Sequence, residues 1–88
     1  MQSKKFKISV IGLGYVGLPL ASSLSKHFYV FGFDTSKKKI KYLLDGNDPT
    51  NQLKFKEFHR KNLKFSTNPK FIKNSKIIIV TVPTPVDK

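Results

Sequence analysis

The sequence predicts an α/β fold, in which four parallel strands form one sheet with helices on both faces. Four short apolar runs alternate with helix-like segments, and strands that alternate with helices imply parallel crossover connections. The first run ends at a glycine-rich turn that leads into a helical pattern, which is how a doubly wound sheet begins. These connections predict the spatial strand order 3-2-1-4.

The first strand is expected over residues 6–11, a β-branched apolar run that stops at Gly12. A helix follows and begins near Tyr15, because apolar residues recur at helical spacing: Val16, Leu20 and Leu24. The second strand is expected over residues 28–34. Ser36 then caps a helix whose predicted apolar face consists of Ile40, Leu43 and Leu44.

The second half of the chain is less regular. Residues 45–49 end the second helix with strong turn formers, and residues 50–62 form either a short amphipathic helix or an irregular insertion. A third strand is expected over residues 63–66 and a short helical segment over 68–74. The last strand, residues 76–82, ends where prolines begin.

Composition excludes several classes of protein. With 88 residues the chain forms at most one small domain. It has no cysteine, which excludes a disulfide scaffold, a cysteine zinc site and a thiol nucleophile. No apolar run reaches the length of a membrane span, and the N-terminal segment is interpreted as folded structure rather than a signal peptide. We therefore expect a cytoplasmic protein.

The chain is strongly basic, with 17 basic residues, 5 acidic residues and a net charge of +12. Such a surplus suggests nucleic acid or another polyanion as a partner, so a small basic α/β module that binds a polyanion is the alternative function. Phenylalanines among the lysines of residues 54–64 could stack on single-stranded bases. Every basic residue except Arg60 is a lysine, which argues against nucleic acid, and a solvated basic face is the simpler interpretation.

The glycine-rich turn carries the spacing GxGxxG at Gly12, Gly14 and Gly17. In the Rossmann fold these glycines permit a tight turn, a close backbone approach to pyrophosphate, and close packing of helix on strand. The helix N-terminus near Tyr15 and Val16 offers free N–H groups to phosphates. A simple tight turn between strand and helix is the alternative interpretation, and the surrounding strand and helix patterns make it the weaker one.

Asp34 lies at the end of the second predicted strand, close to the acidic position of the fingerprint. Its carboxylate can accept both hydroxyl hydrogens of an adenosine ribose and would repel a 2′-phosphate, so NAD is favoured over NADP. Residues 37–39 are lysines, cations that could accept such a phosphate. A plain role at the next helix N-terminus is the alternative for Asp34.

Three segments together are more specific than the fingerprint. Residues 8–21 (ISVIGLGYVGLPLA), 31–34 (FGFD) and 81–87 (TVPTPVD) closely resemble the UDP-glucose/GDP-mannose dehydrogenase family. Residues 26–28 and the last of these segments are most similar to the UDP-N-acetylhexosamine 6-dehydrogenases, which make uronic acids for bacterial polysaccharides. The resemblance covers nearly the whole chain but only the beginning of the family's length.

The resemblance implies an NAD-dependent oxidation of a nucleotide sugar through a cysteine nucleophile. Because this chain has no cysteine, no catalytic residue is assigned, and residues 1–88 are interpreted as a truncated NAD-binding domain without the family's central dimerisation and C-terminal sugar domains. We expect the chain alone not to oxidise a sugar. UDP-sugar would be a substrate only of a full-length enzyme.

The resemblance also carries cofactor contacts onto individual positions. Tyr15 and Val16 match backbone contacts to pyrophosphate, Asp34 matches the ribose acid, and Lys39 and Thr84 match positions near the cofactor. His27 and His59 lack the spacing of metal ligands, so no metal site is expected. The fourth strand would have a partner on one side only, and this exposed edge predicts a route to self-association.

Overall fold

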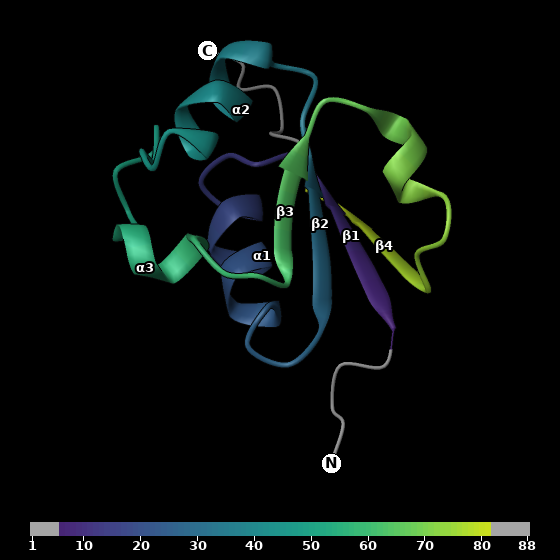
Figure 1. Ribbon diagram of the computed structural model, residues 1–88. Helices are drawn as coiled ribbons and strands as arrows, with labels where there is room; N and C mark the ends of the chain where they lie inside the picture. Colours follow the sequence, from purple (N-terminus) through teal and green to yellow (C-terminus); the bar gives the residue numbers. More distant parts are fainter. Residues whose placement is uncertain (1–5, 82–88) are drawn as a thin grey trace, which may run out of the picture.

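The computed structural model describes residues 6–81, which form a four-stranded parallel sheet of order β3-β2-β1-β4 (Figure 1). The strands are β1 (Lys7–Ile11), β2 (Tyr29–Phe33), β3 (Leu63–Ser66) and β4 (Ile77–Val80). Every pairing is parallel. The predicted fold class and strand order are therefore confirmed.

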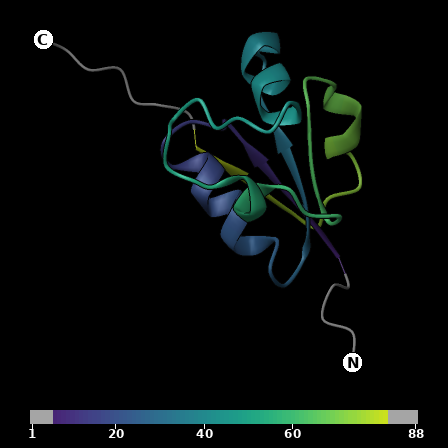
Figure 2. The same cartoon turned by 60° about the vertical axis from the view of Figure 1, so that its left-hand side comes forward.

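The helices lie on both faces of the sheet, as Figures 1 and 2 show. One face carries α1 (Gly17–Leu24), α2 (Lys37–Leu44) and α3 (Phe55–Phe58), and the other carries the 3₁₀ helix η1 (Pro69–Ile72). Two alternatives were open for residues 50–62, a short helix and an irregular insertion, and the structure has the four-residue α3 within an otherwise irregular segment. None of the helices in residues 6–81 has the length and apolarity that a bilayer crossing requires.

The hydrophobic core lies between the sheet and the three helices α1, α2 and α3. Because side chains alternate along a strand, β1, β2 and β3 each send residues into it. Its members are Val10, Leu13, Leu18, Ala21, Val30, Ile40, Leu43, Phe58 and Leu63. Through this core α1 packs against β1 and β2, and α2 packs against β3.

Two residues of the predicted helical patterns are exposed: Val16, which belonged to the spacing of the first helix, and Leu44, which was wrongly assigned to the apolar face of the second. Val16 is 68% exposed and Leu44 is 67% exposed. Val16 precedes α1 as its N-cap, so its side chain lies outside the helical pattern, and α1 instead buries Leu18 and Ala21. Leu44 is the last residue of α2, and no element within residues 6–81 buries it. The predicted cap of that helix is confirmed because Lys39 N–H donates to Ser36 Oγ.

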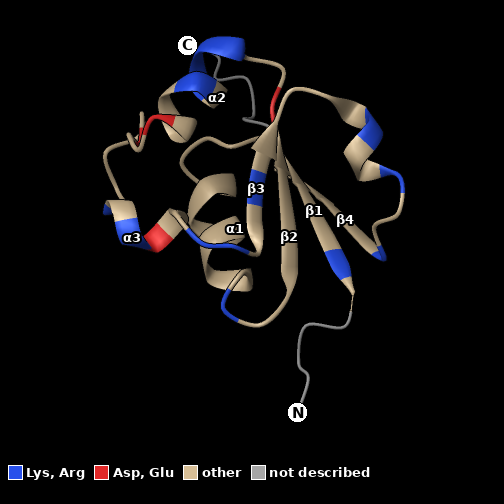
Figure 3. Cartoon of the chain, in the orientation of Figure 1, with Lys and Arg blue, Asp and Glu red and all other residues tan. Residues whose placement is uncertain are grey.

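The basic residues are distributed over several elements (Figure 3). Lysines occur on β1, β3, α2, α3 and the segment around η1. Of the residues 54–64 considered for base stacking, Phe58 is buried at 2% exposure. Phe58 also packs edge-on against Phe65 at 6.5 Å, so its ring belongs to the core.

Candidate cofactor site

The carboxyl ends of β1, β2 and β4 meet at one edge of the sheet. Gly12 follows β1, Asp34 follows β2 and Thr81 follows β4. In open α/β sheets ligands bind at this edge, where the strand order reverses. A cavity of about 600 Å³ lies here, lined by Gly12, Leu13, Gly14, Tyr15, Val16, Asp34, Lys39, Pro49, Thr50 and Thr81.

Two glycines shape the turn from β1 into α1. Gly12 has a φ of +98°, a conformation that glycine adopts without steric cost. A Cβ on Gly17 would lie 1.6 Å from the carbonyl oxygen of Gly12, so only glycine lets α1 begin this close to the turn. Gly17 does not line the cavity; it is buried and positions the helix.

Gly14 has a different role. A Cβ built on it would meet nothing within 4 Å, so this stretch of backbone is open to the cavity. Within residues 6–81, the N–H groups of Gly14, Tyr15 and Val16 donate to no protein acceptor. These free donors at the start of α1, together with the helix dipole, are the arrangement that binds a diphosphate. The residues present therefore fit the pyrophosphate of a dinucleotide.

Asp34 is the acidic group of the site. Its Oδ2 accepts hydrogen bonds from Leu13 N–H at 2.9 Å and from Lys39 Nζ at 3.1 Å. Its Oδ1 accepts from Ser36 N–H at 2.9 Å. Burial raises the pKa of the Asp34 carboxyl, but the hydrogen bonds from Leu13, Ser36 and Lys39 outweigh burial and hold the pKa below its usual value. The side chain is charged at neutral pH.

Lys39 reaches the same position from the first turn of α2. Its ammonium forms an ion pair with Asp34, and the side chains of the two residues are 29% and 11% exposed. The cation therefore stands beside the carboxylate inside the cavity. Among the predicted site residues, the structure brings together Gly12, Gly14, Tyr15, Val16, Asp34 and Lys39. Thr84 lies outside the described residues.

Sequence reasoning missed four residues of the cavity: Leu13, Pro49, Thr50 and Thr81. The single hydroxyl proton of Thr81 is shared between the carbonyl oxygens of Gly12, at 2.7 Å from Oγ1, and Ile11, at 3.2 Å, so Thr81 holds the glycine turn against β4. Pro49 and Thr50 come from the loop after α2. The turn formers of residues 45–49 signalled a loop there, but no pattern in the sequence indicated that it returns to the glycine turn.

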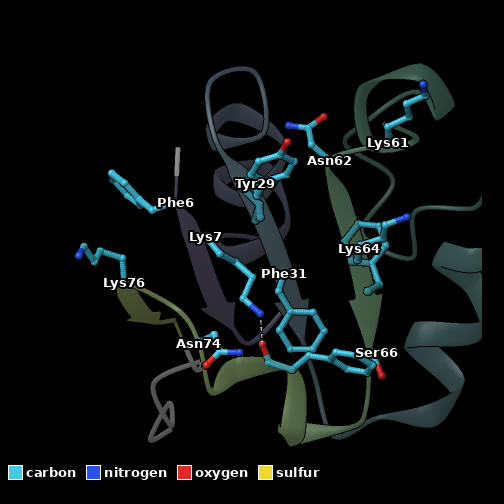
Figure 4. A pocket seen from close by; sticks show the side chains of 13 residues that line it. Phe6, Lys7, Tyr29, Phe31, Lys61, Asn62, Lys64, Ser66, Asn74 and Lys76 are labelled. Carbon is cyan, nitrogen blue, oxygen red and sulfur yellow. Dashed lines mark hydrogen bonds between the residues drawn. The ribbon is translucent and has the colours of Figure 1, made fainter. Parts of the chain in front are cut away.

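A larger cavity, of about 950 Å³, lies on the sheet face that carries η1 (Figure 4). Its wall includes Lys7, Lys61, Lys64 and Lys76 around aromatic side chains, among them Tyr29 and Phe31. Lys7 donates to the carbonyl oxygen of Phe71 and lies over the Phe31 ring at 5.9 Å. Among the residues that the structure describes, no carboxylate and no residue of the glycine turn lines this cavity, so they do not give it the chemistry of the dinucleotide fingerprint.

The residues that the structure describes form no candidate metal site. No group of three or more histidine, cysteine, aspartate or glutamate side chains gathers among them to hold an ion. His27 is exposed. His59 stacks on Phe55 with ring centroids 4.4 Å apart.

Comparison with known proteins decides the family. Residues 6–88 match the model of the UDP-glucose/GDP-mannose dehydrogenase family, NAD binding domain. The chain belongs to this family. Its cofactor is therefore NAD, as the fingerprint predicted, and the resemblance inferred from residues 8–21, 31–34 and 81–87 is confirmed.

Relatives support the finer resemblance as well. The chain is 44% identical over 82 residues to the UDP-N-acetyl-D-glucosamine 6-dehydrogenase of Salmonella typhi, covering 92% of this chain and 19% of the relative. It is 41% identical over 86 residues to the Pseudomonas aeruginosa enzyme of the same name, covering 97% of this chain and 20% of the relative. The chain thus spans about one fifth of the length of the curated relatives it matches.

A solved structure agrees with the fold. The GDP-mannose dehydrogenase of Pseudomonas aeruginosa, determined as a ternary complex, superposes with a TM-score of 0.79 at 31% identity. The match covers 92% of this chain and 20% of that one. This enzyme therefore shares the sheet described above.

Proposed function

We propose that residues 1–88 provide the NAD site for the oxidation of a UDP-N-acetylhexosamine to its uronic acid. The observation that carries this proposal is one cavity lined both by the charged Asp34 and by Gly14, Tyr15 and Val16, whose N–H groups donate to no acceptor within residues 6–81. The substrate class is supported by relatives that are named UDP-N-acetyl-D-glucosamine 6-dehydrogenases.

Each part of the cavity has a task in this function. The free N–H groups at the start of α1 hold the pyrophosphate, and the open backbone at Gly14 allows it to approach closely. Asp34 accepts the ribose hydroxyls through the acceptor capacity that its three hydrogen bonds leave. NAD, when bound, supplies the acceptor for a hydride from the sugar.

The same residues select NAD. A 2′-phosphate in place of the ribose hydroxyl would bring two negative charges together at Asp34, which is ionised at neutral pH. Lys39 lies within the ion pair and offsets part of this repulsion. We therefore expect NADP to bind measurably, but more weakly than NAD.

Oxidation of the sugar needs groups that this chain does not contain. The resemblance implies a cysteine nucleophile, and the 88 residues include no cysteine. We infer that the chain alone binds NAD and does not oxidise a UDP-sugar. The activity belongs to an assembly or polypeptide that also supplies the nucleophile and the sugar site.

A chimera tests the proposal. Residues 6–88 replace the aligned segment of the Salmonella typhi enzyme, and NADH formation is followed with UDP-N-acetylglucosamine. The chimera is expected to reduce NAD, and the same chimera carrying Asp34→Ala is expected to require much more NAD. A chimera that folds and binds the sugar nucleotide but forms no NADH would overturn the proposal, as would sugar oxidation by the isolated chain.

A further inference from the structure

The loop of residues 48–53 joins the α2 end of the fold to α3 and supplies part of the cofactor cavity. Pro49 and Thr50 line that cavity together with Asp34 and Lys39. Nothing in the dinucleotide fingerprint assigns a task to this loop. The conformation of the loop nevertheless determines which groups of Pro49 and Thr50 line the cavity beside the glycine turn.

One carboxylate organises this loop. Asp48 Oδ1 accepts hydrogen bonds from Thr50 N–H and from Thr50 Oγ1, both at 2.7 Å. Its Oδ2 accepts from Gln52 N–H at 2.8 Å and from Leu53 N–H at 2.7 Å. Both oxygens are thus used to hold four donors of the same loop.

The backbone of the loop completes this arrangement. Asn51 has a φ of 59°, a left-handed conformation that asparagine tolerates better than most residues. Its N–H donates to the carbonyl oxygen of Asp48 at 2.9 Å. Leu53, at the end of the loop, packs against the hydrophobic core. The loop is therefore anchored at one end and closed on itself at the other.

The hydrogen bond to Asp48 determines the polarity of Thr50. A hydroxyl has one proton and two acceptor lone pairs, and the proton of Thr50 is committed to Asp48. Thr50 consequently offers a ligand only acceptor lone pairs and a methyl group. Such a surface suits a hydroxyl or amino donor of an adenosine and disfavours a phosphate oxygen, which is itself an acceptor.

We propose that Asp48 is a positioning residue that acts through Thr50, holding this wall of the cavity ready for the adenosine end of NAD and strengthening the preference for NAD over NADP. The inference rests on the proposed function, because it needs the dinucleotide to occupy this cavity. A wall that is ordered before binding spares the ligand the entropy cost of ordering it. An acceptor-only hydroxyl adds a second element, beside Asp34, that opposes a 2′-phosphate.

Four variants test the inference by calorimetry with NAD and with NADP. Asp48→Asn replaces one of the two acceptor oxygens by an amide donor, so two of the four loop donors lose their partner, and we expect NAD affinity to fall about tenfold. The ratio of NAD affinity to NADP affinity is expected to fall as well. Thr50→Val should lower the same ratio, whereas Thr50→Ser keeps the hydroxyl and should bind as the unaltered chain does.

Asp45→Asn is the matched control, because it removes the same charge from the same connection. Within residues 6–81 Asp45 pairs only with Lys41, in an exposed ion pair, and it is not among the residues that line the cavity. Its NAD and NADP affinities are expected to stay unchanged. Hydrogen exchange should show faster exchange of the Thr50, Gln52 and Leu53 amides in Asp48→Asn, with the strands still protected.

The possible results distinguish a failure of the inference about Asp48 from a failure of the proposed NAD site. If Asp48→Asn loosens the loop but keeps both affinities and their ratio, the inference is overturned and the NAD site stands. If Asp48→Asn fails to fold, the pair Thr50→Val and Thr50→Ser decides alone, and equal nucleotide ratios in the two overturn the inference. If the unaltered chain binds no NAD, the proposed site fails and the inference with it.

Discussion

The backbone N–H of Leu13 donates to Oδ2 of Asp34 at 2.9 Å, which ties the glycine turn after β1 to the end of β2. The Leu13 side chain is fully buried in the core. Asp34 also accepts from Ser36 N–H at the start of α2. The two interpretations of Asp34 that the sequence left open, a ribose acceptor and a local backbone partner, are therefore compatible in one side chain.

Substitution of Asp34 should consequently affect both binding and stability. In Asp34→Asn the amide keeps one acceptor oxygen but loses the charge that Lys39 and the backbone donors stabilise. We expect NAD affinity to fall about tenfold or more, because hydrogen bonds to a charged group are lost. Calorimetry checks this, with Asp45→Asn as control. Unchanged NAD affinity in a folded Asp34→Asn chain would remove Asp34 from the site.

Alanine at Gly14 and alanine at Gly17 should give opposite results. The added Cβ at Gly14 has open space, so the chain should fold with an unchanged melting temperature but lose NAD affinity through contact with the pyrophosphate. The added Cβ at Gly17 would meet the Gly12 carbonyl oxygen at 1.6 Å, which should destabilise the fold by about 3 kcal/mol or more. Thermal unfolding and NAD titration of both variants decide, and a Gly17→Ala chain as stable as the original would contradict the packing argument.

The parts of the fold that follow from local patterns were predictable. The β1–turn–α1 unit is encoded by a short stretch in which an apolar run, three glycines and a helical repeat each carry a separate signal. The exposure of Val16 was not predictable in the same way, because helical spacing does not reveal where the helix begins. The predicted burial of Leu44 was wrong for a related reason, because the burial of a residue at a helix end depends on which other element covers it.

Some residues of the site were predictable from local sequence patterns and others were not. Gly12, Gly14 and Asp34 are recognisable because their spacing is local or follows from the length of one βαβ unit. Thr81 and Thr50 reach the cavity only through tertiary structure: β4 must pair with β1, and the loop after α2 must fold back toward the turn. Neither contact leaves a period or spacing in the sequence.

Thr81 should stabilise the glycine turn. In Thr81→Val the shape is kept, but the carbonyl oxygens of Gly12 and Ile11 lose the hydroxyl donor. We expect the free energy of unfolding to fall by about 1 kcal/mol, measured by urea denaturation, whereas Thr81→Ser should lose much less. Equal stability of the valine variant and the original chain would show that the hydroxyl bonds contribute nothing.

Acid should destabilise the chain through two carboxylates. The pKa of Asp48 is raised by burial and lowered more strongly by hydrogen bonds from Thr50, Leu53 and Gln52, so it lies below its usual value, as does that of Asp34. Because the unfolded chain binds protons at higher pH than the folded chain, this stability is fully present above about pH 5 and is lost as the pH falls below about 4.

Urea denaturation across this range measures the effect. The double variant Asp34→Asn, Asp48→Asn should be less stable at neutral pH and should show a shallower loss of stability toward acid. If the double variant loses stability with the same slope as the unaltered chain, other carboxyl groups are responsible for the acid sensitivity.

The outer edge of β4 provides the last prediction, which concerns self-association. Within residues 6–81, β4 pairs with β1 and no described strand pairs with its other edge. Its sequence, IIIV, has no charge, and Ile78 is 52% exposed. An uncharged, apolar edge strand is a template for pairing with a second copy, and the net charge of +12 opposes such pairing until salt screens it.

We therefore propose that the chain self-associates through β4 and that association increases with salt concentration. Ile78→Lys should reduce association in sedimentation experiments at high salt, while the control Leu44→Lys, an equally charged change at an exposed residue of α2, should not. Equal association of the two variants would place the contact elsewhere on the surface.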